Sequence, residues 1–337
     1  HAGGSTNVVL PQNWLFLGSY KKFREKLLRN DTWNLVARMG EGGFESSAAA
    51  GAFTILLTLS RGQGSQSFQL WSDATKPDQD GLATHQLRGL DVSEPRTARA
   101  KAEHLLTTDI KSVSQAGQLE NPDARVAFED EIRANLLNQI ARSHHGLVCG
   151  DRPRMCFSFW EIESLDDVWI PYCGTVKCST LYGGKETLLR WQNCSGPIRE
   201  LPGATNLETH AWDKKGIVVS AMRSLPVTLY TGMAFDNNTA VITANDPAQL
   251  PAIWCFCSSP EYNEAVRRID QKLNVTNATL VKVPFDLEYW TKVAEEKYPH
   301  GLPKPYSDDP TQWIFHGHPV GSVQWSVDSC QLEEGPT

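Results

Sequence analysis

The first sixty residues contain five segments in this order: NVVLPQNWL at residues 7–15, YKKFREKLL at 20–28, WNLVAR at 33–38, GEGGFESS at 40–47 and FTILLTL at 53–59. The second segment has its apolar residues at helical spacing and predicts a helix. The short apolar runs at the start of the first segment and in the third and fifth predict strands. The order strand, helix, strand, Gly-rich loop, strand predicts the closing half of an α/β domain whose opening half is missing.

The sequence also predicts which residues of the helix and of the last strand are buried. Tyr20, Phe23, Leu27 and Leu28 lie on the helix face that we expect to be buried, with the Lys and Arg side chains mostly opposite. The run 53–59 is apolar almost throughout, which is typical of a strand covered on both faces. Because a short Gly-rich loop separates them, the last two strands are expected to pair as an antiparallel hairpin.

Length, composition and charge bound the function. The 337 residues, 40% of them hydrophobic, can bury a sizeable core and predict two domains. A net charge of −7 and a pI near 5.7 provide no global basic field, so nucleic-acid binding would need a local basic surface. No apolar run approaches the ~20 residues of a membrane span, and no signal-peptide pattern is visible. We therefore expect a soluble, cytoplasmic protein with no membrane partner.

The cysteines and histidines do not form a familiar metal or redox motif. The eight cysteines include no C-x-x-C pair, so we expect reduced, mostly buried thiols rather than a zinc ribbon or a redox pair. His316-Gly317-His318 has no third ligand at a suitable spacing, and we expect no metal site. A secreted glycoprotein stays open as an alternative because four asparagines lie in N-x-[ST] sequons, namely Asn193, Asn237, Asn274 and Asn277.

Along the remainder of the chain, the predicted secondary structure changes at two places. Polar and Gly/Ser-rich residues at 62–77 mark a domain edge, and residues 93–116 and 122–143 predict two helices of a connector. Short strands separated by turns are predicted from residue 145 onward, followed by helices starting near Ala248 and Pro260. The predicted organisation is an N-terminal domain at 1–75, a helical connector at 76–145, an α+β domain at 146–290 and a loop-rich tail at 291–337.

The stretches 7–15, 20–28, 36–44 and 53–60 resemble the second half of the catalytic domain of γ-class N6-adenine DNA methyltransferases, of the type IIG restriction-modification and BREX-like kind. The resemblance implies an α/β fold, a partial class I methyltransferase sheet made of its last strands. In that sheet an antiparallel seventh strand is inserted beside the sixth. It also implies methyl transfer from S-adenosylmethionine to adenine N6 in double-stranded DNA, within restriction-modification or phage defence.

The resemblance assigns a role to one aromatic side chain. An enzyme that acts on adenine must extrude the base from the duplex, and an aromatic face compensates for the lost stacking. Phe44 stands at the family's position for that aromatic, on the Gly-rich loop after the sixth strand. Taken alone, Phe44 could equally pack beneath its loop as a core residue. Pro11, Gln12 and Asn13 follow the end of a strand and are predicted to line the rim of the pocket, or else to form an ordinary turn.

Two family motifs are missing. The family binds S-adenosylmethionine at a Gly-rich turn and positions the adenine amine at an (Asn/Asp)-Pro-Pro-(Tyr/Phe) motif, both before the fifth strand. Asn121-Pro122-Asp123-Ala124 lacks the second proline and the aromatic. No catalytic residue is therefore expected in this chain. The cofactor site is expected to lie mostly outside it, in an upstream methyltransferase half, and an attached nuclease is a further possible partner.

Residues 146–290 resemble the target-recognition domain of the same enzymes, carried by the stretches 212–216, 222–226, 235–240, 257–260 and 274–284. Lys214, Lys215 and Arg223 are the predicted phosphate contacts, since Lys and Arg bind the DNA backbone. Asn237 and Asn238 could pair with adenine edges or serve as turn residues. A non-catalytic DNA-binding specificity subunit is the alternative to a methyltransferase.

Overall fold

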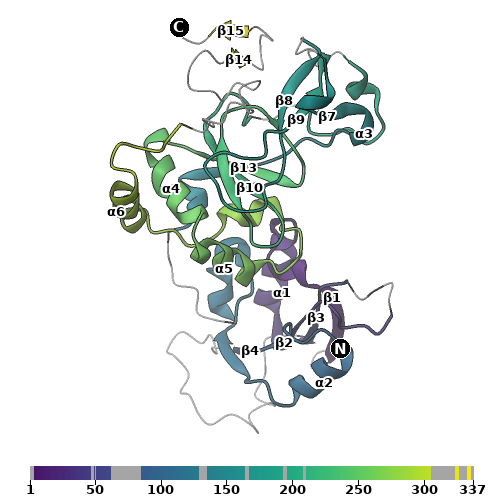
Figure 1. Ribbon diagram of the computed structural model, residues 1–337. Coiled ribbons are helices and arrows are strands. Elements are labelled where there is room, and N and C mark those ends of the chain that lie inside the picture. The colour runs from purple at the N-terminus through teal and green to yellow at the C-terminus, as the bar shows by residue number, and fades with distance from the viewer. Residues whose placement is uncertain are drawn as a thin grey trace. The chain divides into compact units, whose positions relative to one another are not determined.

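The computed structural model describes residues 4–46, 49, 51–61, 85–128, 135–163, 167–192, 196–207, 210–304, 323–325 and 332–334. The chain divides into two compact units, His1–Arg133 and Ala134–Thr337 (Figure 1). Each unit contains helices and β-sheet, so the mixed α/β character predicted from the sequence is confirmed. Within the described residues, no helix is long and apolar enough to cross a membrane.

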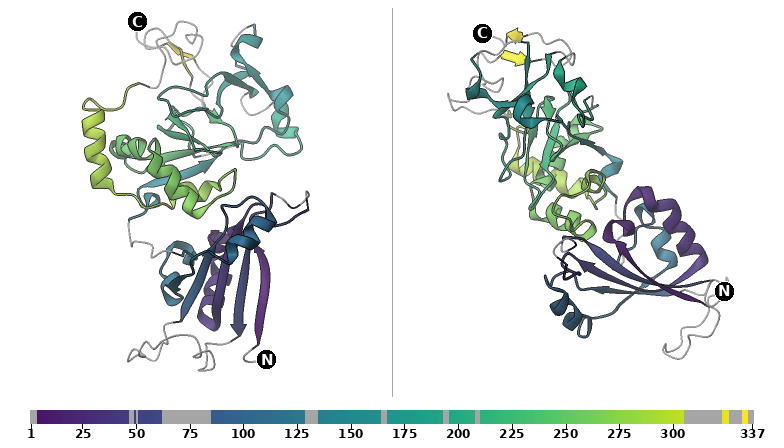
Figure 2. Two further views of the ribbon diagram at one scale, coloured as in Figure 1. Left: turned by 60° about the horizontal axis from the view of Figure 1, so that its bottom comes forward. Right: turned by 90° about the vertical axis from the view of Figure 1, so that its right-hand side faces the viewer.

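The N-terminal unit is built on a five-stranded sheet with strand order β1-β3-β2-β4-β5 (Figure 2). Its elements are β1 (Ser5–Pro11), α1 (Lys21–Asn30), β2 (Asp31–Gly40), β3 (Thr54–Arg61), β4 (Gln86–Asp91), α2 (Ala98–Leu105) and β5 (Lys111–Ser114). β3 lies between β1 and β2 and is antiparallel to both, whereas β4 is parallel to β2 and antiparallel to β5. The three predicted strands, the helix after the first and the antiparallel hairpin are therefore confirmed.

The predicted helical connector is wrong for the described part of 76–145. Within it, β4 and β5 are strands of the N-terminal sheet, and α2 is much shorter than the helix expected at 93–116. Residues 141–145, expected to close the second helix, form a strand of the C-terminal unit. The physical reason is pairing, because β4 joins the edge of β2, which lies some fifty positions earlier in the chain. Local periodicity carries no information about such a partner.

The sheet of the N-terminal unit is covered unequally on its two faces. One face is buried, where Trp33, Val36 and Leu57 are at most 1% exposed, and Trp14 stacks on Trp33. On the other face Ala37 and Leu90 pack near α2, but Val9 and its cross-strand partner Leu56 remain exposed. The prediction that 53–59 is covered on both faces is therefore wrong, because nothing in the described structure covers the β1–β3 end.

Helix α1 buries only part of the predicted face: Leu28 is buried as predicted and Leu27 is half-buried. Tyr20 and Phe23 are exposed, whereas Arg24 is fully buried beside Leu28. The Arg24 guanidinium donates hydrogen bonds to the carbonyl oxygens of Trp14 (2.6 Å), Leu17 (3.2 Å), Asp123 (2.5 Å) and Ala124 (2.8 Å). Burial lowers the pKa of Arg24 to about 10, and the charges of Asp123 and Glu25 act in the opposite direction, so the side chain stays protonated at neutral pH.

The C-terminal unit contains two four-stranded sheets, with orders β11-β10-β13-β6 and β12-β8-β9-β7. Its strands are β6 (Ala141–His145), β7 (Cys156–Ser158), β8 (Trp169–Cys173), β9 (Thr187–Arg190), β10 (Gly216–Ser220), β11 (Val227–Tyr230), β12 (Ala234–Phe235), β13 (Thr239–Ala244), β14 (Val323–Trp325) and β15 (Leu332–Glu334). Its helices are α3 (Arg152–Met155), α4 (Leu250–Cys257), α5 (Pro260–Ile269) and α6 (Leu287–Lys297). Of the short strands predicted after residue 145, those at 216–222, 227–230 and 240–243 are confirmed in type and approximate position, whereas the strand predicted at 154–162 is extended only at β7.

The core of this unit lies between the first sheet and helices α4, α5 and α6. The helix predicted near Ala248 is confirmed as α4, preceded by a short turn that Asp246 caps through the Ala248 amide at 2.9 Å. Trp290 and Ala294 of α6 are buried in the same core. The boundary predicted at residue 290 is therefore wrong, since α6 crosses it and anchors what was expected to be a tail.

We predict that Arg24→Leu lowers the free energy of unfolding by about 3–5 kcal/mol, because four buried carbonyl groups lose their donors together. Urea denaturation of the full chain measures this loss. Lys22→Ala, on the exposed side of the same helix, should change the value by less than about 0.5 kcal/mol. Equal stabilities of Arg24→Leu and the parent protein would contradict the structural role of Arg24.

Candidate functional site

Three strand ends meet at one edge of the N-terminal sheet. β1 and β2 are both antiparallel to β3, and β4 is parallel to β2, so the carboxyl ends of β1, β2 and β4 share that edge. Thr54, the first residue of β3, pairs with Pro11 on one side and Gly40 on the other. The predicted rim residues and the Gly-rich loop therefore flank the same strand. In open α/β sheets this edge is where ligands bind.

The glycines of the loop allow a close contact with the segment after β4. Gly40 and Gly42 have φ values of +64° and +79°, and a Cβ at Gly42 would lie 2.2 Å from the Arg96 carbonyl oxygen. The Arg96 guanidinium also pairs with Glu41 at 2.8 Å. The loop is therefore braced against its neighbour, which only glycine permits at these positions.

The segment after β4 is itself held by a buried cation. Lys101 of α2 has no exposed surface, and its Nζ donates to the carbonyl oxygens of Val92 (2.9 Å) and Ser93 (3.3 Å). Burial lowers the pKa of Lys101, and the nearby charge of Arg96 acts in the same direction. The Gly-rich loop thus rests on a segment that the core of the unit fixes in place.

Phe44 lies on this loop with 41% of its surface exposed. Of the two interpretations open from the sequence, a core residue beneath the loop does not fit that exposure. An exposed aromatic side chain beside three strand ends is available to a planar ligand. The stacking role itself remains a prediction.

The three predicted rim residues differ in exposure. Pro11 is exposed, Asn13 is half-buried and Gln12 is buried. The backbone N–H of Gln12 donates a hydrogen bond to the Phe53 carbonyl oxygen at 2.9 Å and so links the end of β1 to the start of β3. Asn13 Oδ1 is buried without a hydrogen-bond partner in the described structure. A buried acceptor without a donor is costly unless a ligand or water supplies one.

In the C-terminal unit, basic residues lie on and near β6, the edge strand of the first sheet. Burial lowers the pKa of His144 on β6, and the charges of Lys214, His210 and Arg142 act in the same direction. His144 Nε2 lies 2.8 Å from Thr243 Oγ1. We call Arg142, His144, His210 and Lys214 the basic patch; the lowered pKa leaves His144 uncharged at neutral pH, so Arg142 and Lys214 are its permanently charged members. Of these four residues, sequence reasoning predicted a phosphate contact only for Lys214.

Arg223 does not join the basic patch. Lys215 precedes β10 next to Lys214, whereas Arg223 follows the far end of that strand. There Arg267 donates to the Arg223 carbonyl oxygen at 2.6 Å, beside Lys272. The three predicted phosphate contacts are therefore divided between the two ends of β10. Their contacts with DNA remain predictions.

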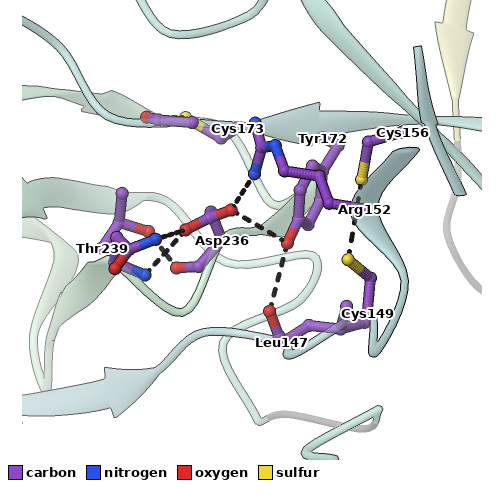
Figure 3. Close-up of polar contacts among 10 residues, drawn as sticks. Leu147, Cys149, Arg152, Cys156, Tyr172, Cys173, Asp236 and Thr239 are labelled. Carbon is purple, nitrogen blue, oxygen red and sulfur yellow. Dashed lines mark hydrogen bonds and ion pairs between the residues drawn. The ribbon is translucent and has the colours of Figure 1, made fainter. Parts of the chain in front are cut away.

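The two candidate asparagines lie in a turn organised by a buried carboxylate. Asp236 is 3% exposed, and its Oδ1 accepts hydrogen bonds from the Asn238 amide (2.7 Å) and Nδ2 (2.8 Å). Its other oxygen accepts from Arg152 and from Tyr172 (3.4 Å), and Tyr172 also donates to the Leu147 carbonyl oxygen at 3.1 Å (Figure 3). Asn238 thus has the turn role that was one of its two interpretations, and Asn237 is half-buried beside it. Sequence reasoning missed Asp236, since nothing marks its burial.

Other candidate ligands find no support. His144 and His145 lie on strand β6. His316-Gly317-His318 lies outside the described residues. Within the described ranges, no group of three or more His, Cys, Asp or Glu side chains could hold a metal ion.

The backbone fold is similar to parts of several solved structures. It is similar to that of the type IIL restriction-modification enzyme MmeI, determined in complex with DNA, with a TM-score of 0.51 and 12% identity over 87% of this chain. This chain spans 41% of the MmeI chain, so the likeness concerns a part of that enzyme. Weaker likenesses are to the ATP-dependent type ISP enzyme LlaBIII bound to DNA (TM-score 0.43, 8% identity, 91% of this chain and 26% of that one) and to the DrdV–DNA complex (0.41, 10%, 97% and 42%). No protein-family model matches the sequence, and no curated protein does.

We predict that Gly42→Ala loosens the loop that carries Phe44 and costs about 1–3 kcal/mol, because Cβ collides with the Arg96 carbonyl at a positive φ. Hydrogen exchange across residues 40–46 measures the loosening. Gly51→Ala is the matched control, since a Cβ there meets nothing nearer than 3.9 Å. Unchanged exchange in Gly42→Ala would show that the close contact does not hold the loop.

Proposed function

We propose that this chain supplies the target-base pocket and the DNA-recognition part of a site-specific DNA methyltransferase of a restriction-modification system, which transfers a methyl group from S-adenosylmethionine to adenine N6. The observation that carries the proposal is exposed Phe44 on a braced loop at an edge where three strands end. The fold likeness to a part of MmeI is consistent with it but supports only the architecture.

The strand order adds support. The family resemblance implies a sheet in which the final, antiparallel strand is inserted beside the sixth. β3 is antiparallel and lies between β1 and β2, with α1 joining the two parallel strands (Figure 2). In this interpretation β1, β2 and β3 are the fifth, sixth and seventh strands of a methyltransferase sheet.

The chemistry of the edge suits a flipped base. An extrahelical adenine loses stacking on both faces, and an aromatic side chain recovers about 1–3 kcal/mol per base. Phe44 is proposed to supply that face. Asn13 Oδ1 is an acceptor without a donor and is proposed to accept a hydrogen bond from the base, with Pro11 and Gln12 forming the rim.

The residues present do not fit S-adenosylmethionine by themselves. Neither the Gly-rich turn that binds the cofactor nor the Asn-Pro-Pro-Tyr type motif occurs in the 337 residues. The one Asn-Pro, at Asn121, instead forms a turn in which the Asp123 and Ala124 carbonyls bind Arg24. We propose that another part of the enzyme holds the cofactor and positions the reacting amine.

The C-terminal unit is proposed to bind the duplex through its positive groups. Lys214 and Lys215 precede β10, Arg142 and His144 lie on edge strand β6 of the same sheet, and Arg223 follows the far end of β10. Lysine and arginine contacts with phosphate give affinity without sequence information, so base reading would fall to neighbouring side chains such as Asn237.

The second candidate function is a non-catalytic DNA-binding specificity subunit, favoured by the same missing motifs. The two candidates differ in the location of an Asn-Pro-Pro-Tyr type motif. In a methyltransferase it lies upstream in the same reading frame. In a specificity subunit it lies in a separate partner protein.

We predict that the chain binds a duplex with an adenine opposite an abasic site more tightly than the fully paired duplex, because the unstacking cost is already met. Phe44→Ala should reduce this preference by about 1–3 kcal/mol, whereas Phe44→Trp should retain it. Fluorescence anisotropy with labelled duplexes measures both. A preference that survives Phe44→Ala unchanged would remove Phe44 from the base pocket.

We predict that Lys214→Gln weakens duplex binding equally for unrelated sequences and lowers the slope of log K against log salt by about 1, as expected for one lost phosphate contact. Lys292→Gln on exposed α6 is the control and should leave the slope unchanged. The measurement is a salt titration of affinity. An unaltered slope in Lys214→Gln would place the DNA elsewhere on this unit.

A further inference from the structure

Two cysteines face one another beside the carboxylate that organises the C-terminal unit. Cys149 precedes α3 and Cys156 follows it, and their Sγ atoms lie 3.9 Å apart, with the Cys156 thiol donating to Cys149 (Figure 3). The turn between them is tight, because Gly150 has a φ of +75° and a Cβ there would lie 3.0 Å from the Ala204 amide. The sequence contains no C-x-x-C pair, so this proximity arises from the fold alone.

The surroundings make the two thiols unequal. The hydrogen bond from Cys156 lowers the pKa of Cys149, burial opposes it, and the positive charge of Arg152 lowers it further. The same hydrogen bond and burial raise the pKa of Cys156. Cys149 is therefore the sulfur that ionises, and Cys156 retains its proton.

Access distinguishes this pair from the three most deeply buried of the described thiols, though not from Cys178. Cys149 is 7% exposed and Cys156 is half-buried, whereas Cys173, Cys255 and Cys257 are at most 2% exposed. Cys178 is exposed and free. Half-buried Cys156 gives a small oxidant a route to the pair, and among the described thiols this pair combines a sulfur of lowered pKa with a second thiol 3.9 Å away.

We propose that Cys149 and Cys156 are a redox-sensitive pair that hydroperoxides convert to a disulfide. The Cys149 thiolate attacks one peroxide oxygen, an S–O bond forms, the O–O bond breaks, and the leaving oxygen takes a proton to become water or an alcohol. The Cys156 sulfur then attacks the Cys149 sulfenic acid, an S–S bond forms, and the hydroxyl leaves with the Cys156 proton as water. The pair gives up two electrons, and the peroxide accepts them.

The disulfide would close a short loop around Arg152, whose guanidinium binds Asp236. Asp236 in turn fixes the turn at Asn238 and the hydroxyl of Tyr172. Oxidation therefore stiffens the segment 147–156 and the turn that it contacts, and we expect the melting temperature of the oxidised chain to rise by several degrees. This inference is independent of any role in DNA binding.

The test treats the reduced full-length chain with hydrogen peroxide and follows it by intact mass and peptide mapping. The expected product is a Cys149–Cys156 disulfide, formed about tenfold faster than any oxidation of Cys178, since the thiolate is the reacting form. In Cys156→Ser, Cys149 should stop at the sulfenic acid and react with dimedone. Cys178→Ser is the control and should form the disulfide at the parental rate.

Mapping of the unmutated chain keeps the test decisive even if a variant folds poorly. Oxidation of Cys178 with Cys149 and Cys156 still reduced would overturn the proposal. Separate over-oxidation of the two sulfurs, without a disulfide between them, would overturn it equally.

Discussion

The packing of α1 in the N-terminal unit depends on the buried cation Arg24. The Arg24 guanidinium joins helix α1 to the segment that follows β1, through the Trp14 and Leu17 carbonyls, and to the turn at Asp123 and Ala124. Asp123 and Ala124 both have positive φ values, so the backbone is in the left-handed region where these two carbonyl groups point at the guanidinium. A planar donor with several N–H groups suits a site that contains only acceptors. The segment after β1 also carries the candidate rim residues, so the same contact positions the candidate site.

The C-terminal unit uses the opposite charge for a similar purpose. Buried Asp236 collects donors from Arg152, Tyr172 and Asn238, which come from three separate segments. A buried carboxylate is tolerated when its oxygens are paired and hydrogen-bonded in this way. The Cys149–Cys156 thiol pair lies near this carboxylate. Arg142 and His144 of the basic patch lie on edge strand β6. Affinity for phosphate and sensitivity to oxidation would thus belong to the same half of the chain.

Prediction from sequence succeeded where the signal was local. The apolar runs at 7–10, 33–38 and 53–59 became strands, and the Gly-rich loop closed a hairpin, because alternation and loop chemistry act over a few residues. It failed for β4 and β5, which exist because they pair with strands distant in sequence. The Gly-rich loop and the rim residues do flank the same strand, while the roles predicted for them stay predictions. The basic patch, the role of Asp236 and the thiol pair had no local signature.

The sequence by itself determined the order of strand, helix and hairpin and the position of the exposed aromatic loop, because backbone propensity and glycine content are properties of short segments. The tertiary structure decided which side of α1 is buried. The helical pattern predicted that Phe23 is buried and Arg24 exposed, but carbonyl oxygens of Trp14, Asp123 and Ala124 surround the guanidinium, while Phe23 stays half-exposed with one edge against Trp14. Periodicity treats a charge as a surface residue, whereas the fold supplied acceptors from distant segments that stabilise the charge in the interior.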